Sequence, residues 1–446
     1  MMTEVVATLI AARNALLGQL PMSSMEFLKQ IPHPTPQGWD AVSRSIIESA
    51  DWDVPDEQKV LKPELMDPGY DPVASDQLRI MINNDPLIDN LANTYTSLRM
   101  AAVAVPDTAP PVIGGIRADE NAPGASTAKI GALYALYQLL YEMSKLAAEN
   151  SLTTIRTLQT KANQIWAATG FTDNSRRNRL PRLNLLFQFY DDDTVDVYGP
   201  SSRRPVMDHF DLFGSGPKLF FKKEILKILW WNPDTERAGQ VVGFSHGEVA
   251  GLLFRYIGFA YVASVMIKSG LFKIEGGLFG AGIWVKSDYN KGSWSDAEDP
   301  IPIQQTKKQG HRTVVTRPGL PSTQNITAKS VADFFVLLWQ GRIVNKSVSD
   351  EMLSILGRGG CLVNFDEDAL KFANKLDTLA SKCGYVGAIS NDALLMADRE
   401  VAAHYVIVVL ANQTALDEEF RPKKPGKPSK SFDFFKQIRA ALQNFS

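Results

Sequence analysis

The stretch "ENAPGASTAKIGALYALYQLLYEM", residues 120–143, combines two features that rarely occur together. A loop of small residues leads into Ser126 and Lys129, and an almost unbroken apolar run follows. A helix that is apolar on nearly all sides is buried in a core. The pattern therefore predicts a buried helix over about residues 126–149, with a serine and a lysine at its beginning.

Ser126 and Lys129 are three positions apart, so both side chains project from one face of a helix. A serine hydroxyl is a weak nucleophile at neutral pH and needs a neighbouring base. Burial lowers the pKa of a lysine, and a neutral amine can accept the serine proton. The positive end of the helix dipole also favours an oxyanion beside Ser126. The pair therefore indicates a nucleophile and its base.

A simpler interpretation of Ser126 remains open, because a serine at the start of a helix is usually an N-cap. The same spacing occurs again at Ser215 and Lys218, where a cap before Pro217 explains it. Ser126 differs in its context, since it follows two short β-type runs and opens the most apolar helix of the chain. Spacing alone does not choose between the cap and the nucleophile.

The order of elements predicts the fold class. Two short strands are expected over residues 96–120, and three strands over residues 380–413. The run Val406–Leu410 is nearly all apolar, which is typical of a central strand buried on both faces. We expect an α/β sandwich, with one five-stranded antiparallel sheet flanked by helices. A mainly helical body with insertions, about residues 150–325, would separate the two groups of strands.

The domain organisation follows from a change in composition near residue 95. Residues 1–95 are rich in Pro and Asp with short helical patterns, which predicts an N-terminal helical extension. Residues 96–446 would form the main domain. With 446 residues and 45% hydrophobic content, the chain can bury a large core.

Composition also limits the partners. A net charge of −2 does not favour nucleic acid or an anionic membrane surface. No apolar run of 18 residues predicts a membrane span, and the N-terminus is a poor signal peptide, so we expect a cytoplasmic location. Cys361 and Cys383 show neither a disulfide framework nor a zinc spacing. The run Asp191–Asp193 is interpreted as a solvated turn, so no metal and no organic cofactor are expected.

Three segments resemble those of serine β-lactamases and penicillin-binding D,D-peptidases, nearest the class A-like branch. "PGASTAKIGALYALYQL" is similar to the SxxK segment, and "SKCGYVGAISNDALLMAD…HYVIVVLAN" to the KTG strand and the two strands after it. "NITAKSVADFFVLLWQGRIVNKSVSDEMLSIL" resembles the helix pair that precedes the KTG strand. The resemblance covers roughly residues 98–446 and implies the β-lactamase/transpeptidase-like fold.

The resemblance also implies roles for single residues. Ser126 matches the acylated serine and Lys129 its paired base. Ser245, in "GFSHGEVAGLLFRYIG", matches the serine of the SxN motif, which passes a proton to the leaving group. Lys382 matches the lysine of KTG. Gly384 matches its glycine, and the backbone N–H groups of Ser126 and Tyr385 would form the oxyanion hole.

The chain departs from the family at two of these positions. Cys383 stands where the family has Thr or Ser, so a hydroxyl that helps to hold a substrate carboxylate is missing. Gly247 stands where the SxN asparagine is expected, so a side-chain amide is missing. No counterpart of the class A deacylating glutamate is evident, with Glu248 and Glu275 the nearest by position. These departures argue against efficient β-lactam hydrolysis.

We therefore expect a serine hydrolase or acyl transferase that forms an acyl-enzyme on Ser126 from a small-molecule or peptide-like amide or ester. Two alternatives remain open. One is a cytoplasmic biosynthetic thioesterase or acyltransferase on the same fold. The other is a catalytically inactive relative that serves as a binding or scaffold module. The sequence makes no prediction of the oligomeric state.

Overall fold

The structure is a computed structural model. Its description covers fifteen ranges, which are residues 67–167, 180–190, 218–230, 247–258, 261–262, 265–266, 269–275, 279–285, 307–309, 312–314, 324–357, 376–386, 389–401, 403–412 and 430–446.

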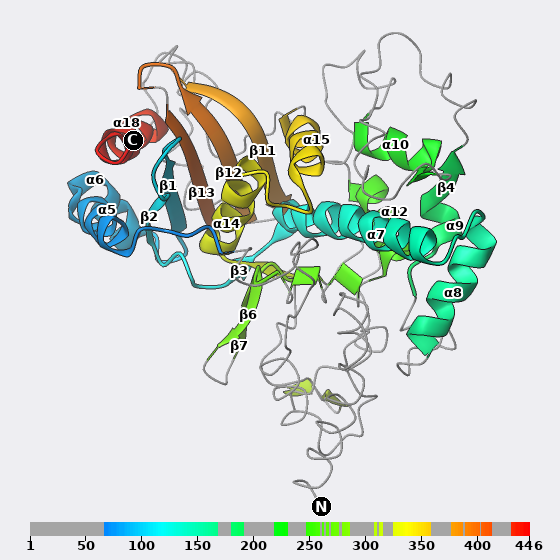
Figure 1. Ribbon diagram of the computed structural model, residues 1–446. Coiled ribbons are helices and arrows are strands. Elements are labelled where there is room, and N and C mark those ends of the chain that lie inside the picture. The colour runs from blue at the N-terminus through cyan, green and yellow to red at the C-terminus, as the bar shows by residue number, and fades with distance from the viewer. Residues whose placement is uncertain are drawn as a thin grey trace, which may run out of the picture.

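A five-stranded antiparallel sheet forms the centre of the molecule (Figure 1). The strand order is β11-β12-β13-β1-β2. Two strands come from the first third of the chain and three from its last part, and this confirms the predicted sheet. The bounds are β1 Arg99–Val105, β2 Val112–Ile116, β11 Leu376–Val386, β12 Ile389–Asp398 and β13 Ala403–Asn412.

β13 lies in the middle of the sheet, as its apolar sequence predicts. It pairs with β1 from Arg99↔Leu410 to Val105↔His404, and on its other side with β12. Side chains of a strand alternate between the two faces of a sheet. Val406 and Val408 belong to one hydrophobic core, whereas Tyr405, Ile407 and Val409 belong to the other.

Helices cover both faces of the sheet (Figure 1). One face packs against α5, α6 and α18, and the other against α14, α15 and the beginning of α7. This arrangement explains why the strands carry apolar residues at nearly every position. The bounds of these helices are α5 Pro72–Asn84, α6 Pro86–Thr94, α7 Lys129–Glu149, α14 Ala328–Trp339, α15 Lys346–Gly357 and α18 Lys430–Gln443.

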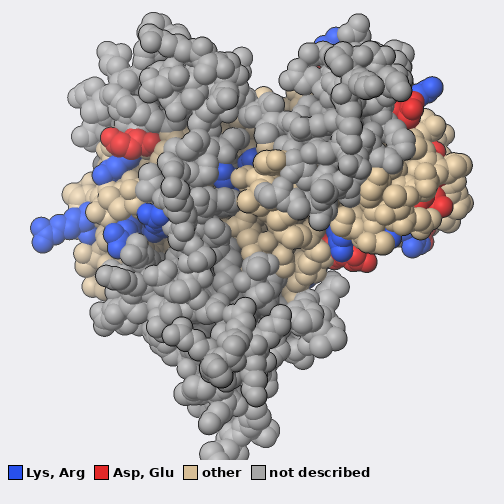
Figure 2. All heavy atoms as spheres, turned by 180° about the vertical axis from the view of Figure 1, so that it is seen from behind, with Lys and Arg blue, Asp and Glu red and all other residues tan. Residues whose placement is uncertain are grey.

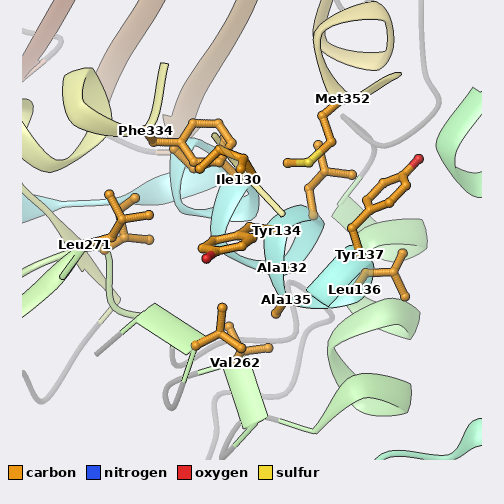
Figure 3. Packing of buried hydrophobic residues seen from close by; sticks show 14 of the residues in the cluster. Ile130, Ala132, Tyr134, Ala135, Leu136, Tyr137, Val262, Leu271, Phe334 and Met352 are labelled. Atoms are coloured by element: carbon orange, nitrogen blue, oxygen red, sulfur yellow. The ribbon is translucent and has the colours of Figure 1, made fainter. Parts of the chain in front are cut away.

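The buried helix predicted from residue 126 begins slightly later than expected. Residues Ala125–Ala128 form a 3₁₀ turn, η2, and the α-helix α7 starts at Lys129. Tyr134 and Ile130 of α7 lie among apolar side chains of other elements, including Phe334 of α14 and Met352 of α15 (Figure 3). The hydrophobic core on this side of the sheet therefore packs around α7.

The ends of α14 agree with the sequence, whereas the start of α15 does not. Thr327 caps α14 in a capping box with Ser330, and Gly341 follows the helix with a φ of 70°. For the next helix, the segment "SVSDEMLSILG" (residues 347–357) predicts Ser347 or Ser349 as the cap. Instead, the side chain of Asn345 accepts a hydrogen bond from the backbone of Val348. The Ser349 hydroxyl accepts a hydrogen bond from the backbone N–H of Ile343 and donates one to the carbonyl of Ile343, so it has no capping role.

The helical body that separates the two groups of strands lies around and beyond α7 (Figure 1). Its helices confirm the helical patterns of the middle section. Several two-stranded ribbons accompany them. The bounds are α8 Ile155–Ala167, α9 Leu183–Leu186, α10 Lys223–Trp230, α12 Gly247–Ile257, β3 Ala122–Pro123, β4 Phe187–Tyr190, β5 Lys218–Phe221, β6 Phe272–Glu275, β7 Phe279–Gly282, β8 Lys307–Gln309, β9 Arg312–Val314 and β10 Asn325–Ile326.

The predicted boundary at residue 95 stays a prediction, since residues 1–66 lie outside the described ranges. The last part of the predicted extension contains α5 and α6. Leu78 and Ile82 of α5 are fully buried against β2, and α5 also contacts α18. These two helices therefore contribute to the second core of the sheet.

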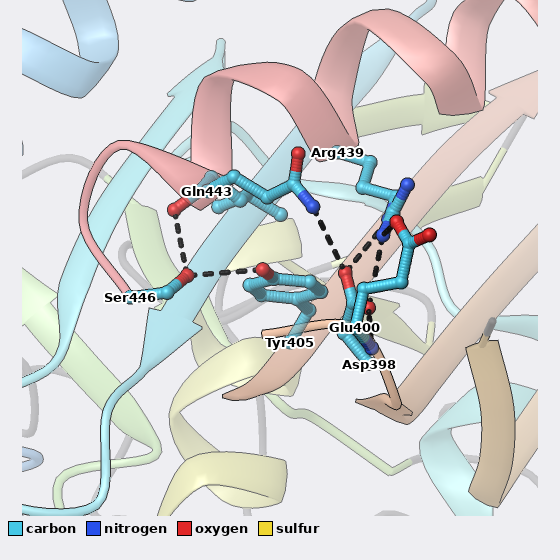
Figure 4. A network of polar contacts seen from close by, with 7 residues as sticks. Asp398, Glu400, Tyr405, Arg439, Gln443 and Ser446 are labelled. Carbon is cyan, nitrogen blue, oxygen red and sulfur yellow. Dashed lines mark hydrogen bonds and ion pairs between the residues drawn. The ribbon is translucent and has the colours of Figure 1, made fainter. Parts of the chain in front are cut away.

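A buried ion pair fixes α18 to the sheet (Figure 4). Nε and Nη2 of Arg439 donate to Asp398 at 2.7 and 2.9 Å, and Nη2 also donates to Glu400 at 2.7 Å. The side chain of Asp398 is fully buried. Burial works against the charged carboxyl, but these hydrogen bonds outweigh it and lower the pKa of Asp398.

We expect Arg439→Leu to destabilise the fold by about 3 kcal/mol, because it leaves the buried Asp398 charge without its partner. Arg399→Leu is the matched control, since Arg399 pairs with Asp377 at the surface and its loss should leave the midpoint of urea unfolding unchanged. The Asp398 contribution is present above the unfolded carboxyl pKa of about 3.9 and is lost as pH falls through the lower folded value. Equal midpoints for the two variants would contradict the prediction.

Candidate active site

Ser126 lies in the 3₁₀ turn η2, and two hydrogen bonds hold the beginning of this turn in place. The backbone of Gly124 donates to the carbonyl of Gln324 at 3.0 Å, and the Gln324 amide donates back to the carbonyl of Ala125. Ala125 has a φ of 41°, a left-handed backbone that residues with a Cβ rarely adopt. The strained residue directly before Ser126 is thus fixed by the surrounding hydrogen bonds.

The hydroxyl of Ser126 does not cap a helix. The residue at the cap position of η2 is Gly124 and that of α7 is Ala128, and neither end has a side-chain capping bond. Ser126 itself is half-buried. The N-cap interpretation of this serine is therefore excluded, and the nucleophile interpretation stays.

Lys129 is the first residue of α7, and its side chain is fully buried. Burial lowers the pKa of Lys129 from 10.5 to about 6, and the nearby positive charge of Lys382 adds to the effect. A lysine with this pKa is mostly a neutral amine at pH 7. It can therefore act as a base, as its position in the sequence predicts.

The edge strand β11 lies directly against the turn that carries Ser126. A Cβ built on Gly384 would stand 2.6 Å from the Thr127 hydroxyl, 2.9 Å from the Thr127 backbone nitrogen and 3.0 Å from the Gly124 carbonyl oxygen. Only a glycine allows the two backbones to approach this closely. The structure thus brings the Lys382–Gly384 segment and the Ser126–Lys129 segment together.

Lys382 is 2% exposed, and its ammonium donates to the carbonyl of Cys383 at 2.7 Å. Burial lowers the pKa of Lys382 to about 8, while the carboxylate of Asp392 on β12 acts in the opposite direction. At pH 7 this lysine is mostly charged, whereas Lys129 is mostly neutral. The two lysines therefore have the different charge states that a base and an anion-binding group require.

Sequence reasoning missed two polar residues of β12 that support this region. Asn391 is paired with Gly384 across the strands, and its side-chain amide donates to the carbonyls of Pro123 at 2.9 Å and Gly124 at 3.3 Å. Asp392 is fully buried and stands opposite Cys383. The signal was present in "ISNDALLMAD", where three consecutive polar residues, Ser390 to Asp392, interrupt a buried apolar strand.

Tyr385 lies at the exposed end of β11, and 53% of it is open to solvent. Because β11 is an edge strand, its outer backbone groups are not used by the five-stranded sheet. The assignment of the Ser126 and Tyr385 N–H groups to an oxyanion hole stays a prediction.

Cys383 differs from the sequence-based expectation, because it is disulfide-bonded. The chain has one other cysteine, Cys361, which lies outside the described ranges. The spacing of the two cysteines indicated no disulfide framework, so this bond was not predicted. Cys383 has no free thiol to take the place of a substrate-binding hydroxyl. Disulfides persist mainly in oxidising compartments, so this bond argues against the predicted cytoplasmic location, which stays a prediction.

The predicted third motif is only partly visible. Ser245 lies outside the described ranges, and so its distance from Ser126 is untested. Gly247 is the first residue of α12, which packs against α7. Glu248 and Glu275 fall on α12 and β6, and their side chains are not described.

Neither a metal cluster nor a spanning helix occurs in the part of the chain that the structure describes. Within it, no three metal-ligating side chains of the His, Cys, Asp and Glu types come together. The described helices are also too short or too polar to cross a lipid bilayer.

Comparison with known proteins bears on the family resemblance. Residues 301–425 match the model of the β-lactamase enzyme family, and this range includes α14, α15 and the strands β11 to β13. The resemblance to serine β-lactamases and penicillin-binding proteins is confirmed. A search of the curated proteins found no match.

Solved structures with the β-lactamase-like fold were also found. A β-lactamase from Sphaerobacter thermophilus DSM 20745 is 14% identical with a TM-score of 0.36, over 80% of this chain and 96% of that chain. A β-lactamase from Chitinophaga pinensis DSM 2588 is 11% identical with a TM-score of 0.42, over 80% and 97%. PBP-A in an acyl-enzyme complex with penicillin G is 13% identical with a TM-score of 0.31, over 84% and 96%.

The two lysines of this β-lactamase-like site predict a bell-shaped pH dependence of acylation. The rate should rise as Lys129 loses its proton near pH 6 and fall as Lys382 loses its proton near pH 8. These values belong to the coupled pair, so each limb reports an apparent pKa. Acylation rates measured from pH 5 to 10 would check this. A rate that keeps rising through pH 8 would contradict the role of a charged Lys382.

Proposed function

We propose that the protein is a serine hydrolase or acyl transferase that forms an acyl-enzyme on Ser126 from an amide or ester substrate. The observation that carries the proposal is the fully buried Lys129, whose pKa burial lowers to about 6, three residues after a half-buried Ser126 that has no capping role. The close approach of Gly384 to Thr127 supports it, because it places the edge of β11 beside the same turn.

In the proposed reaction the Ser126 oxygen attacks the substrate carbonyl and its proton passes to the Lys129 amine. The carbonyl oxygen becomes an oxyanion, which the backbone N–H groups of Ser126 and Tyr385 would stabilise. When the carbon–leaving-group bond breaks, the leaving group takes up the proton, and Ser245 would assist this transfer. The charged Lys382 would hold an anionic part of the substrate.

The second half of the reaction returns Ser126. Water or another acceptor attacks the acyl ester and gives its proton to the neutral Lys129 amine, the ester bond breaks, and the serine oxygen takes up that proton from the resulting Lys129 ammonium. The sequence shows no counterpart of the class A glutamate that activates this water. We therefore propose slow release of the acyl group, which suits transfer to an acceptor as well as hydrolysis.

The test is the mass of the intact protein after incubation with a panel of β-lactams and a fluorophosphonate. We expect one adduct per chain on the wild type and none on Ser126→Ala. The reagent that reacts begins to define the substrate. An adduct that persists on Ser126→Ala would remove the nucleophile assignment, and a wild type without any adduct would favour the inactive binding or scaffold relative.

A further inference from the structure

A cleft lies in the helical body, beside α8 and α9. These helices lie at the C-terminal end of α7, whereas Ser126 precedes its first residue (Figure 1). α7 has 21 residues and is therefore about 30 Å long. The cleft has a volume of about 800 Å³. Its walls come from α8, from the segment around α9 and from the end of β5, and none of its lining residues belongs to the proposed active site.

Hydrogen bonds fix the walls of the cleft to one another. The side chain of Gln159 on α8 accepts from the backbone of Leu183 at 2.7 Å and donates to the carbonyl of Pro181 at 3.2 Å. The backbone of Lys222 donates to the carbonyl of Leu186 at 2.9 Å. The elements that form the walls of the cleft are thus hydrogen-bonded to one another and are not separate surface loops.

The charged side chains that line the cleft are all positive. They are Arg156 of α8, Arg182 before α9 and Lys222 after β5, and among the residues that the structure describes no Asp or Glu lines the cleft. Within the described residues none of these three side chains forms an ion pair or a hydrogen bond. Lys and Arg side chains gather on the same side of the molecule, at the left of Figure 2. Three positive charges without counterions around a concave surface attract an anion.

The remaining lining adds hydrogen-bonding groups and an apolar part. Amide side chains come from Gln159, Asn163, Asn184 and Gln188, and Ile155 and Leu180 add apolar groups. A volume of about 800 Å³ is within the range of sites for small organic molecules and exceeds the size of a single inorganic ion. Guanidinium groups bind phosphate and carboxylate oxygens in pairs.

We propose that this cleft binds a small organic polyanion that carries two or more phosphate or carboxylate groups. Arg156, Arg182 and Lys222 contact the anionic groups, and the amides contact the neutral polar part of the ligand. The site is separate from Ser126, so the proposal does not depend on the proposed acyl-enzyme.

Calorimetric titration with pyrophosphate and with citrate tests the proposal, and the two probes distinguish phosphate from carboxylate ligands. We expect at least one probe to bind, with an affinity that falls as salt is raised. Arg156→Gln and Arg182→Gln should each weaken this binding at least tenfold. Lys161→Gln is the matched control, because Lys161 also lies on α8 but does not line the cleft, and it should change the affinity less than twofold.

Two results would overturn the proposal. One is the absence of binding by either probe to the full-length wild type at millimolar concentration. The other is an equal loss in Arg156→Gln and Lys161→Gln, which would show a response to net charge instead of to this cleft. The thermal midpoints of all variants should equal that of the wild type, because Arg156 and Arg182 are exposed.

Discussion

Lys129→Met should reduce the acylation rate at pH 7 at least a thousandfold and at the same time raise the free energy of unfolding. The rate falls because the Ser126 proton loses its acceptor, and loss of a base of this kind costs several powers of ten. The stability rises because methionine fills a similar volume in a fully buried position without a group that water solvates strongly.

The stability effect has a defined pH dependence. The folded-state pKa of Lys129 is about 6, against 10.5 for the free side chain, so between these values the unfolded chain binds one more proton than the folded chain. Wild-type stability therefore rises with pH from about 6 to 10.5. The Met variant lacks this slope. The free energy of unfolding of the Met variant should exceed that of the wild type most at pH 6 and below, and this difference should shrink as pH approaches 10.5.

Acylation kinetics and urea unfolding at pH 6, 8 and 10 would measure both effects. Lys346→Met serves as the control, because 76% of the Lys346 side chain is exposed and neither readout should change. A Lys129→Met variant that acylates at the wild-type rate would show that another group accepts the proton. A loss of stability at pH 6 would show that the lysine has a structural role.

Gly384→Ala should lower the acylation rate about a hundredfold while the protein stays folded. The added Cβ would stand 2.6 to 3.0 Å from atoms of Thr127 and Gly124, two of them backbone atoms that cannot rotate away. β11 and the Ser126 turn must then move apart by a large fraction of an ångström. A displacement of about 1 Å between reacting groups can cost a factor of about 10² in rate.

Gly131→Ala is the matched control for this substitution. Gly131 lies two residues after Lys129, and the Cβ added there would meet side-chain atoms of Ile283 and Met266 at 3.1 Å. Flexible side chains can yield by this amount, so the acylation rate should change little. The acylation rates of the two variants should be compared with each other, and circular dichroism spectra should be recorded to check that both variants are folded. Equal rates would show that the edge of β11 does not border the reacting groups.

The sheet could be predicted from the sequence because its strands carry strong local signals. The alternation and apolar content of Arg99–Val105 and Ala403–Asn412 identify strands without any knowledge of their partners. Ser126 and Lys129 could be singled out because a helix that is apolar on all sides makes a lysine at its start conspicuous. To predict that β1 pairs with β13, a further rule was required, which is that an exposed apolar strand must pair with another strand.

Contacts that depend on register could not be predicted in the same way. The bond of Asn391 to the Pro123 and Gly124 carbonyls exists only because β12 pairs with β11 in one register and η2 packs at their edge. The disulfide of Cys383 likewise depends on where another segment lies in space. The cleft near α8 is lined by residues from three segments of the chain, and none of these segments has a local sequence pattern that indicates a site.

The pairing of β1 with β13 has a consequence for how the protein is made. Val103 and its partner Val406 are separated by roughly 300 residues, so a ribosome finishes β1 long before β13 exists. During that interval the apolar hairpin β1–β2 has an open edge, and such edges pair readily with other chains. Release of the chain before residue 403 would leave the centre of the sheet unfilled. Recovery of the native protein from cells should therefore depend on chaperones that cover this edge until translation is complete.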